Sequence, residues 1–293
     1  MANDRLTVIT GSGDDRIALR LAAGSADTLQ IDLGDDGSAD RSFDRDRFSQ
    51  IVVISGSGAD HIRIDQVNGV IADESVDYFT GSGDDTVDGG DAVERFHTGS
   101  GDDAVDGNRG NDRGELGSGR DSFRWDPGDG SDVVEGGTGS DTLDFNGAVQ
   151  DEIMSLTPNG RRALFLRNLG NIRMDTDDVE RLDLTALGGA DTVTVDDMSG
   201  TDFRQADVDL GGAGDGGTDT VTVEGTEGDD DIDVVASGAR VDVDGLQVQT
   251  RVAGADPTDR LEVDARGGDD DVEVDPAAEA LIEVLVDLGT GQG

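Results

Sequence analysis

The chain has 293 residues, enough for one large domain or two ordinary ones, and its formal net charge of −45 excludes attraction to nucleic acid or to an anionic membrane surface. It has no cysteine, which excludes disulfides and thiol chemistry. No apolar run approaches the roughly 18 residues of a membrane-spanning helix.

The acidic residues are mostly aspartates. There are 67 acidic residues, of which 12 are Glu, and all 22 basic residues are Arg. Asp favours turns, whereas Glu favours helices, so this acidity indicates turns rather than helices. With 45 glycines and 3% aromatics, the chain would remain disordered unless its carboxylates were neutralised. We therefore expect a turn-rich protein that needs counter-ions in order to become compact.

One turn motif, Gly-x-Gly-x-Asp-x-apolar, recurs along the chain. Weaker copies at 189–193, 217–221, 228–232 and 268–272 keep only Gly-x-Asp-x-apolar. The full copies are GSGDDRI (11–17), GSGADHI (56–62), GSGDDTV (81–87), GSGDDAV (99–105), GSGRDSF (117–123), GDGSDVV (128–134) and GTGSDTL (137–143).

The spacing of these copies predicts the fold. TGSGDDTVDG at 80–89 returns as TGSGDDAVDG at 98–107, an offset of 18 residues. Glycines on alternate residues permit a tight turn, and the apolar residue after each Asp begins a short strand. Two such halves form one coil, so the sequence predicts an all-β, right-handed parallel β-solenoid of the β-roll or β-helix type. Val87, Val105 and Phe123 are expected in an inner column, and Asp85, Asp103 and Asp121 in an outer one.

Carboxylates stacked in this way predict a cation site. Neighbouring strands lie about 4.8 Å apart, so aligned carboxylates repel each other unless a cation lies between them. Oxygen ligands without His or Cys indicate Ca²⁺, whereas Mg²⁺ demands a stricter octahedron. Several calcium ions are therefore expected at the motif aspartates, namely Asp15, Asp60, Asp85, Asp103, Asp121, Asp132, Asp141, Asp191, Asp219, Asp230 and Asp270.

The motif resembles the hemolysin-type (RTX) calcium-binding nonapeptide, a β-helix repeat. Thr80, Thr98 and Leu116 stand where that family has its first glycine. The resemblance implies that an Asp and turn carbonyls of one coil share an ion with the next coil. NRGND at 108–112 has lost its first Gly, which makes the opposite side a poorer calcium site. The implied carbonyl donors are Gly81, Gly83, Gly99, Gly101, Gly117 and Gly119.

The motif density divides the chain into four parts. We expect N-terminal coils over 1–79, a regular calcium β-roll over 80–145, an irregular β segment over 146–180 and C-terminal coils over 181–293, forming one continuous solenoid. A hairpin is expected near TPNG at 157–160. A longer repeat of roughly 80 residues aligns RLDLTALGGADTVTVD, which begins at Arg181, with RLEVDARGGDDDVEVD, which begins at Arg260.

Two classes of function fit this sequence. The favoured one is a non-catalytic, extracellular or cell-surface structural protein, exported without a cleavable N-terminal signal peptide. The alternative is a calcium-binding module or scaffold of a secreted carbohydrate-active enzyme or toxin. The absence of Lys and the presence of only two His, His61 and His97, weigh against the enzyme. Acidic adaptation to salt would scatter the carboxylates instead of placing them in Gly-rich turns.

The two ends of the sequence predict a homopolymer. Written one after the other, residues 284–293 and 1–17 continue the pattern of the internal passage at 208–234. A contact of this kind does not close and would build a head-to-tail filament. A piece cut from a longer repeat array would show the same pattern.

Overall fold

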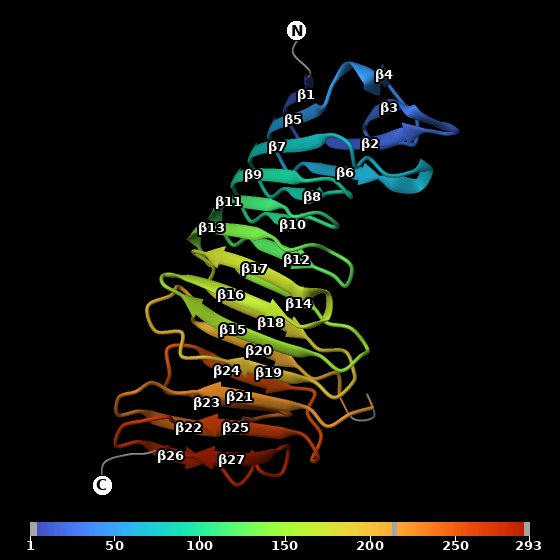
Figure 1. Ribbon diagram of the computed structural model, residues 1–293. Coiled ribbons are helices and arrows are strands. Elements are labelled where there is room, and N and C mark those ends of the chain that lie inside the picture. Colours follow the sequence, from blue (N-terminus) through green and yellow to red (C-terminus); the bar gives the residue numbers. More distant parts are fainter. Residues whose placement is uncertain (1–4, 213–215, 290–293) are drawn as a thin grey trace. The chain divides into compact units, whose positions relative to one another are not determined.

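The computed structural model describes residues 5–212 and 216–289, and the chain divides into two compact units after Thr142 (Figure 1). The residues beyond 289 and before 5, which belong to the predicted filament contact, lie outside the described residues. In both units the strands form two sheets, and most neighbouring strands are parallel. The prediction of an all-β parallel solenoid is therefore confirmed. No helix in the described ranges is both long and apolar enough to cross a membrane.

In the first unit, successive parallel strands alternate between the two sheets, so that each pair of strands makes one coil. Short 3-10 turns η1 (Arg45–Arg47) and η2 (Gln66–Asn68) follow two of the strands. In spatial order, one sheet contains β1 (Arg5–Ser12), β5 (Gln50–Ser57), β7 (Ser75–Ser82), β9 (Glu94–Ser100), β11 (Arg113–Gly119) and β13 (Val133–Gly139). The other contains β12 (Ser122–Trp125), β10 (Ala104–Asp106), β8 (Thr86–Asp88), β6 (His61–Asp65), β2 (Arg16–Ala22), β3 (Ser25–Leu33) and β4 (Arg41–Asp44).

The core of this unit is a stack of apolar side chains repeated from coil to coil. Val105 lies in register between Val87 and Phe123, as the 18-residue offset predicts. All three are at most 2% exposed. On the neighbouring sheet, the rings of Tyr78 and Phe96 stack at a centroid distance of 5.1 Å. The period-two alternation of the strands thus directs one face of each sheet into the core.

Glycines allow successive turns to come into direct contact. Gly101 has φ +133°, and a Cβ built on it would lie 2.0 Å from the carbonyl oxygen of Gly83 in the preceding coil. Gly13 has a similar φ of +119°, but no atom lies within 4 Å of its Cβ position. Both positions need glycine for their backbone conformation, and only the first also needs it for coil contact.

We expect Gly101→Ala to destabilise the protein by roughly 1–3 kcal/mol more than Gly13→Ala, because only the former forces the turns apart. Urea unfolding of both variants in calcium measures the difference. Equal losses would mean that the close approach of the turns contributes nothing beyond backbone strain.

The second unit combines parallel coils with antiparallel ribbons. A 3-10 turn, η3 (Leu169–Asn171), precedes β17. One sheet contains β17 (Ile172–Asp177), β16 (Arg162–Arg167), β15 (Ile153–Asn159), β19 (Thr192–Val195), β21 (Thr220–Glu224), β25 (Arg260–Asp264) and β27 (Glu283–Asp287). The other contains β26 (Asp271–Val274), β22 (Asp231–Ser237), β23 (Arg240–Asp244), β24 (Gln249–Ala253), β20 (Gln205–Asp209), β18 (Arg181–Thr185) and β14 (Thr142–Asn146).

The ribbons are where the structure differs most from a plain repeat of coils. The hairpin expected near 157–160 is present, as β15 and β16 pair antiparallel on either side of it. Two further ribbons, β2–β3–β4 and β22–β23–β24, were not predicted. The two copies of the 80-residue repeat also begin in different sheets, since their first strands, β18 and β25, lie in opposite sheets.

Candidate metal centre

Six of the seven motif aspartates of the first unit form one column. The backbone N–H of each of the first five donates to Oδ1 of the next aspartate in the column, at 2.8–2.9 Å. These contacts join residues that are 45, 25, 18, 18 and 20 positions apart in the chain. The column consists of Asp15, Asp60, Asp85, Asp103, Asp121 and Asp141.

This column is buried, which corrects the prediction that Asp85, Asp103 and Asp121 face outward. Their exposed fractions are 1%, 2% and 1%. Asp and the apolar residue two positions later share a strand face, so both side chains point into the core. The exposed column is instead made by the preceding residue of each motif, as at Asp84 and Asp102.

A second column lies on the opposite side of the first unit, where the sequence predicted a poorer site. The N–H of Glu94 donates to Asp112 Oδ1, and the N–H of Asp112 donates to Asp132 Oδ1, both at 2.8 Å. Asp132 thus belongs to this column and not to that of Asp121. Glu94 and Asp112 were missed, although GDAVE at 90–94 keeps the first glycine of the motif and places Glu where the motif has Asp.

The second unit contains two shorter columns built by the same contact. The weaker motif copies are therefore assembled like the full ones, at contact distances of 2.8–2.9 Å. Glu152 and Asp259 were not predicted as members. One column consists of Glu152, Asp191, Asp219 and Asp259, and the other of Asp230 and Asp270.

The predicted glycines lie on the turns beside the first column. Gly81 and Gly83 are stacked below Gly99 and Gly101, whose Cα atoms face the carbonyls of the preceding coil. Gly117 and Gly119 continue the stack. Thr80 and Thr98, which replace the family's first glycine, are fully buried, and each hydroxyl donates to a carbonyl of the next coil. Carboxylate, carbonyl and hydroxyl oxygens thus line the interior of these turns.

One oxygen of most column carboxylates has no hydrogen-bond partner. While Oδ1 accepts the N–H of the neighbouring coil, Oδ2 is buried and unpartnered. This holds for Asp60, Asp85, Asp103, Asp121, Asp191 and Asp270. A buried carboxylate oxygen left without a partner costs free energy unless a proton or a cation neutralises it.

The pKa values of several column carboxyls are raised by this burial. Burial, with neighbouring carboxylates adding to it, raises the pKa of Asp103 to about 6 and that of Asp121 to about 7. Burial also raises the pKa of Asp191 to about 7. In the second column, burial raises the pKa of Glu94 to about 8, and burial together with the charge of Glu94 raises that of Asp112 to about 9. The folded chain therefore binds protons at these positions when nothing else neutralises them.

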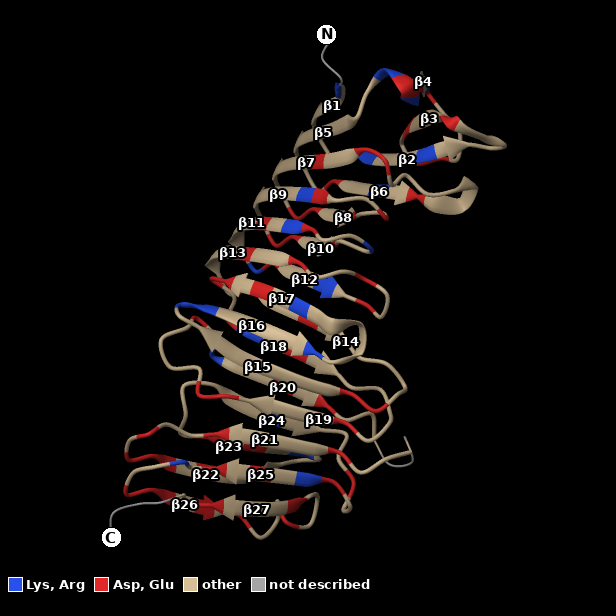
Figure 2. Ribbon diagram, in the orientation of Figure 1, with Lys and Arg blue, Asp and Glu red and all other residues tan. Residues whose placement is uncertain are grey.

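Elsewhere the chain supplies its own counter-charge to buried carboxylates. Arg167 is buried and forms an ion pair with Glu152, the first member of its column. Arg20 and Asp32 form a buried pair at 2.8 Å. Among the described residues, no Arg or His lies within ion-pair distance of Asp85, Asp103 or Asp121. Acidic residues recur in coil after coil of both units, whereas basic residues are few (Figure 2).

The two histidines and one surface cluster lie outside the columns. His97 stacks on Phe79, and its Nδ1 lies 2.9 Å from Glu115 Oε2 on an outer sheet face. His61 Nε2 lies 3.9 Å from a carboxylate oxygen of Asp88. A group of three carboxylates within 4.8 Å of one another, not predicted from the sequence, is formed by Asp177, Asp178 and Asp202.

Comparisons with known proteins identify no family. No family model and no curated protein matches the chain. Among solved structures, the chain is similar to the extracellular lipase LipA from Serratia marcescens, at 13% identity and a TM-score of 0.25. The match covers 73% of this chain and 43% of the lipase chain, so the chain spans less than half of that protein. The geometry of the chain itself shows an all-β parallel solenoid with buried carboxylate columns.

Proposed function

We propose that the protein is a non-catalytic, calcium-binding structural protein of the hemolysin-type repeat kind, in which ions between the coils hold the solenoid together. The observation that carries this proposal is the row of buried Oδ2 atoms without partners in the Asp60–Asp121 part of the first column. These atoms repeat at the spacing of the coils, and no Arg in the described part of the chain forms an ion pair with their carboxylates. A divalent cation between successive turns would neutralise two carboxylates at once.

The ligand chemistry favours calcium. The turn interiors offer only oxygen atoms, and His and Cys are absent from them. Ca²⁺ accepts six to eight oxygens in flexible geometry, including backbone carbonyls. Mg²⁺ keeps its waters and an octahedral shell, which fits poorly between two closely stacked turns. Asp residues with the adjacent Gly carbonyls would hold the ions.

A calcium count tests the proposal. After exhaustive chelation and dialysis against about 1 mM CaCl₂, a concentration suited to extracellular calcium modules, atomic emission should find several calcium ions per chain. Dialysis against MgCl₂ at the same concentration should leave substantially less metal bound. A calcium content near zero, or equal binding of both metals, would overturn the proposal.

The non-catalytic and extracellular parts of the proposal follow from the same arrangement. The strongly perturbed carboxyls of the columns are buried between coils, where a substrate cannot reach them. Extracellular calcium modules bind the ion at the millimolar concentrations found outside cells, and an extracellular location would supply this calcium.

Head-to-tail assembly is a further part of the proposal. β27 is the edge of its sheet and carries Leu285 and Val286, with exposed fractions of 42% and 41%. An exposed apolar edge strand is a template for pairing with another chain. We expect the protein to sediment as polymers in millimolar calcium and Leu285→Lys to sediment as smaller species. A strictly monomeric wild-type protein would contradict this.

A further inference from the structure

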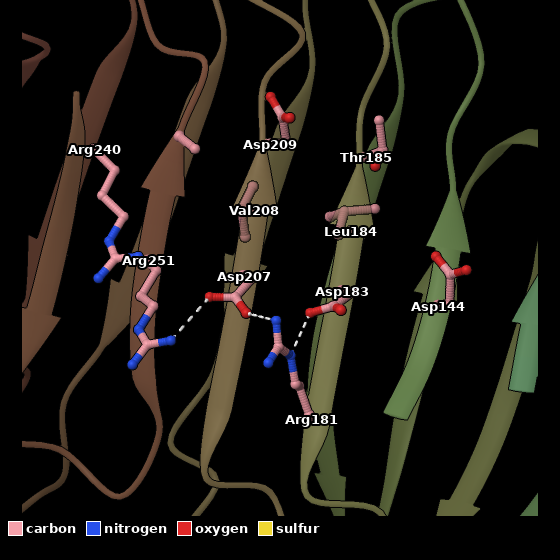
Figure 3. A pocket seen from close by; sticks show the side chains of 11 residues that line it. Asp144, Arg181, Asp183, Leu184, Thr185, Asp207, Val208, Asp209, Arg240 and Arg251 are labelled. Carbon is pink, nitrogen blue, oxygen red and sulfur yellow. Dashed lines mark hydrogen bonds and ion pairs between the residues drawn. The ribbon is translucent and has the colours of Figure 1, made fainter. Parts of the chain in front are cut away.

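An open groove of about 450 Å³ lies on the outer face of a sheet in the second unit (Figure 3). It runs across the neighbouring strands β23, β24, β20, β18 and β14, which corresponds to roughly 19 Å at the usual strand spacing. Charged side chains dominate its lining. The ones that carry the argument are Arg181, Asp183, Asp207, Arg240 and Arg251.

Strand register places three of these side chains in one polar row. Asp183 lies beside Asp207, and Asp207 lies beside Arg251. Arg181 bridges the two carboxylates, since its Nε donates to Asp183 Oδ1 at 2.5 Å and its guanidinium pairs with Asp207. Guanidinium groups and acids therefore alternate in the middle of the groove, in the order Arg251, Asp207, Arg181 and Asp183, as the labelled side chains in Figure 3 show.

The row retains hydrogen-bonding capacity that the protein does not use. Nη1 of Arg251 lies 3.7 Å from the nearest Asp207 oxygen, which is too long for a hydrogen bond and leaves both groups able to bind a further partner. Burial raises the pKa of Asp183, and contact with Asp207 adds to the shift. Donors and acceptors thus lie side by side in a cavity that is open to solvent.

The lining restricts the chemistry of a ligand. It contains no aromatic residue and no Met, so nothing offers a stacking platform for a flat ring system. Its three Arg are balanced by four Asp, so it has no excess positive charge to hold a polyanion. A hydroxyl group both donates and accepts, and a pair of neighbouring hydroxyls matches a carboxylate next to a guanidinium.

We propose that this groove binds a saccharide, with adjacent sugar hydroxyls donating to Asp207 and accepting from Arg251. Asp183 and Arg181 hold the next hydroxyls along the row, and Arg240 lies at the end of the groove. The inference goes beyond the structural function proposed above. It assigns a binding face and no reaction.

A glycan array tests it. The fluorescently labelled full chain, in saturating calcium, is applied to printed neutral and uronic-acid oligosaccharides, and the strongest binder is titrated by calorimetry. Arg251→Gln and Asp207→Asn should each weaken binding about tenfold or more, as expected for lost hydrogen bonds to charged groups. The matched control is Arg260→Gln, because Arg260 lies in the other sheet of the same unit and pairs with Glu283 at 3.0 Å.

The outcomes separate cleanly. Binding of neutral sugars supports hydroxyl recognition, and a loss confined to uronic acids in Arg240→Gln supports a carboxylate contact at that end of the same groove. Failure of the wild-type chain to bind any printed saccharide overturns the inference, as does unchanged binding by both groove variants when their circular dichroism is native. Calcium content is measured in parallel, so a protein that binds calcium but no sugar leaves the proposed function standing.

Discussion

Acidification should fold the metal-free protein as calcium does at neutral pH. In excess chelator, we expect the protein to be largely unfolded at pH 8 and to regain β structure at pH 5. The folded-state pKa values of Asp103 and Asp121 are raised to about 6 and about 7, above the ordinary 3.8. The folded chain therefore binds more protons than the unfolded chain between about pH 4 and pH 7, and the free energy of unfolding falls as pH rises through this range. The contribution is complete below about pH 4 and is lost above the folded-state pKa values.

Circular dichroism between pH 4 and pH 9, with chelator and with calcium, measures this effect. With calcium, the β signal should persist at pH 8, because the ion replaces the protons. A metal-free protein that is equally folded at pH 5 and pH 8 would contradict the expectation, and so would one that unfolds on acidification. The second result would mean that the column carboxylates are stabilised as anions by some other group.

Replacing one column carboxylate should have opposite effects in the two conditions. Asp103→Asn keeps an oxygen that can accept the N–H of Asp85 but removes a buried charge. Without metal, the pH at which the chain unfolds should rise, because relief of the raised pKa is worth on the order of 2 kcal/mol at pH 8. With calcium, the same variant should bind fewer ions and unfold at lower urea, because two neighbouring turns lose a shared ligand.

The matched control for this variant is Asp84→Asn. Asp84 has the same charge and belongs to the preceding copy of the motif, but its side chain is exposed, and Oδ1 accepts the N–H of Asp102. We expect a small change of the same sign in both conditions, because solvent screens this charge. If Asp84→Asn and Asp103→Asn behave alike, overall acidity and not the buried column governs stability.

Much of this architecture can be predicted from local sequence. The offset between Val87 and Val105 predicts the coil, and the recurring Gly-x-Asp turns predict which aspartates stack. The inward direction of Asp85 could also have been inferred, since it shares its period-two face with Val87. The column was assigned to the outer face because carboxylates usually face water, and this assignment was wrong. Burial of a charge depends on what neutralises it, and that partner is not part of the local pattern.

Other features depend on contacts that local pattern does not encode. Strands such as β3 and β23 alternate polar and apolar residues in the same way whether their neighbours are parallel or antiparallel, so the extra ribbons were missed. Glu94 and Glu152 were missed because the Gly-x-Gly-x-Asp motif requires Asp, whereas Glu at the same position also places a carboxylate in the column. The groove at Asp183 and Arg251 combines residues 68 positions apart whose proximity follows from strand register alone.

The contact between column carboxylates is constant, while the length of peptide between contacts is not. In the first column, intervals of 45, 25, 18, 18 and 20 residues all end in the same N–H to Oδ1 bond at 2.8–2.9 Å. The interval between two contacts can therefore grow from 18 to 45 residues without altering the contact itself. New outer surfaces can thus arise and diverge while the interior that holds the coils together stays unchanged.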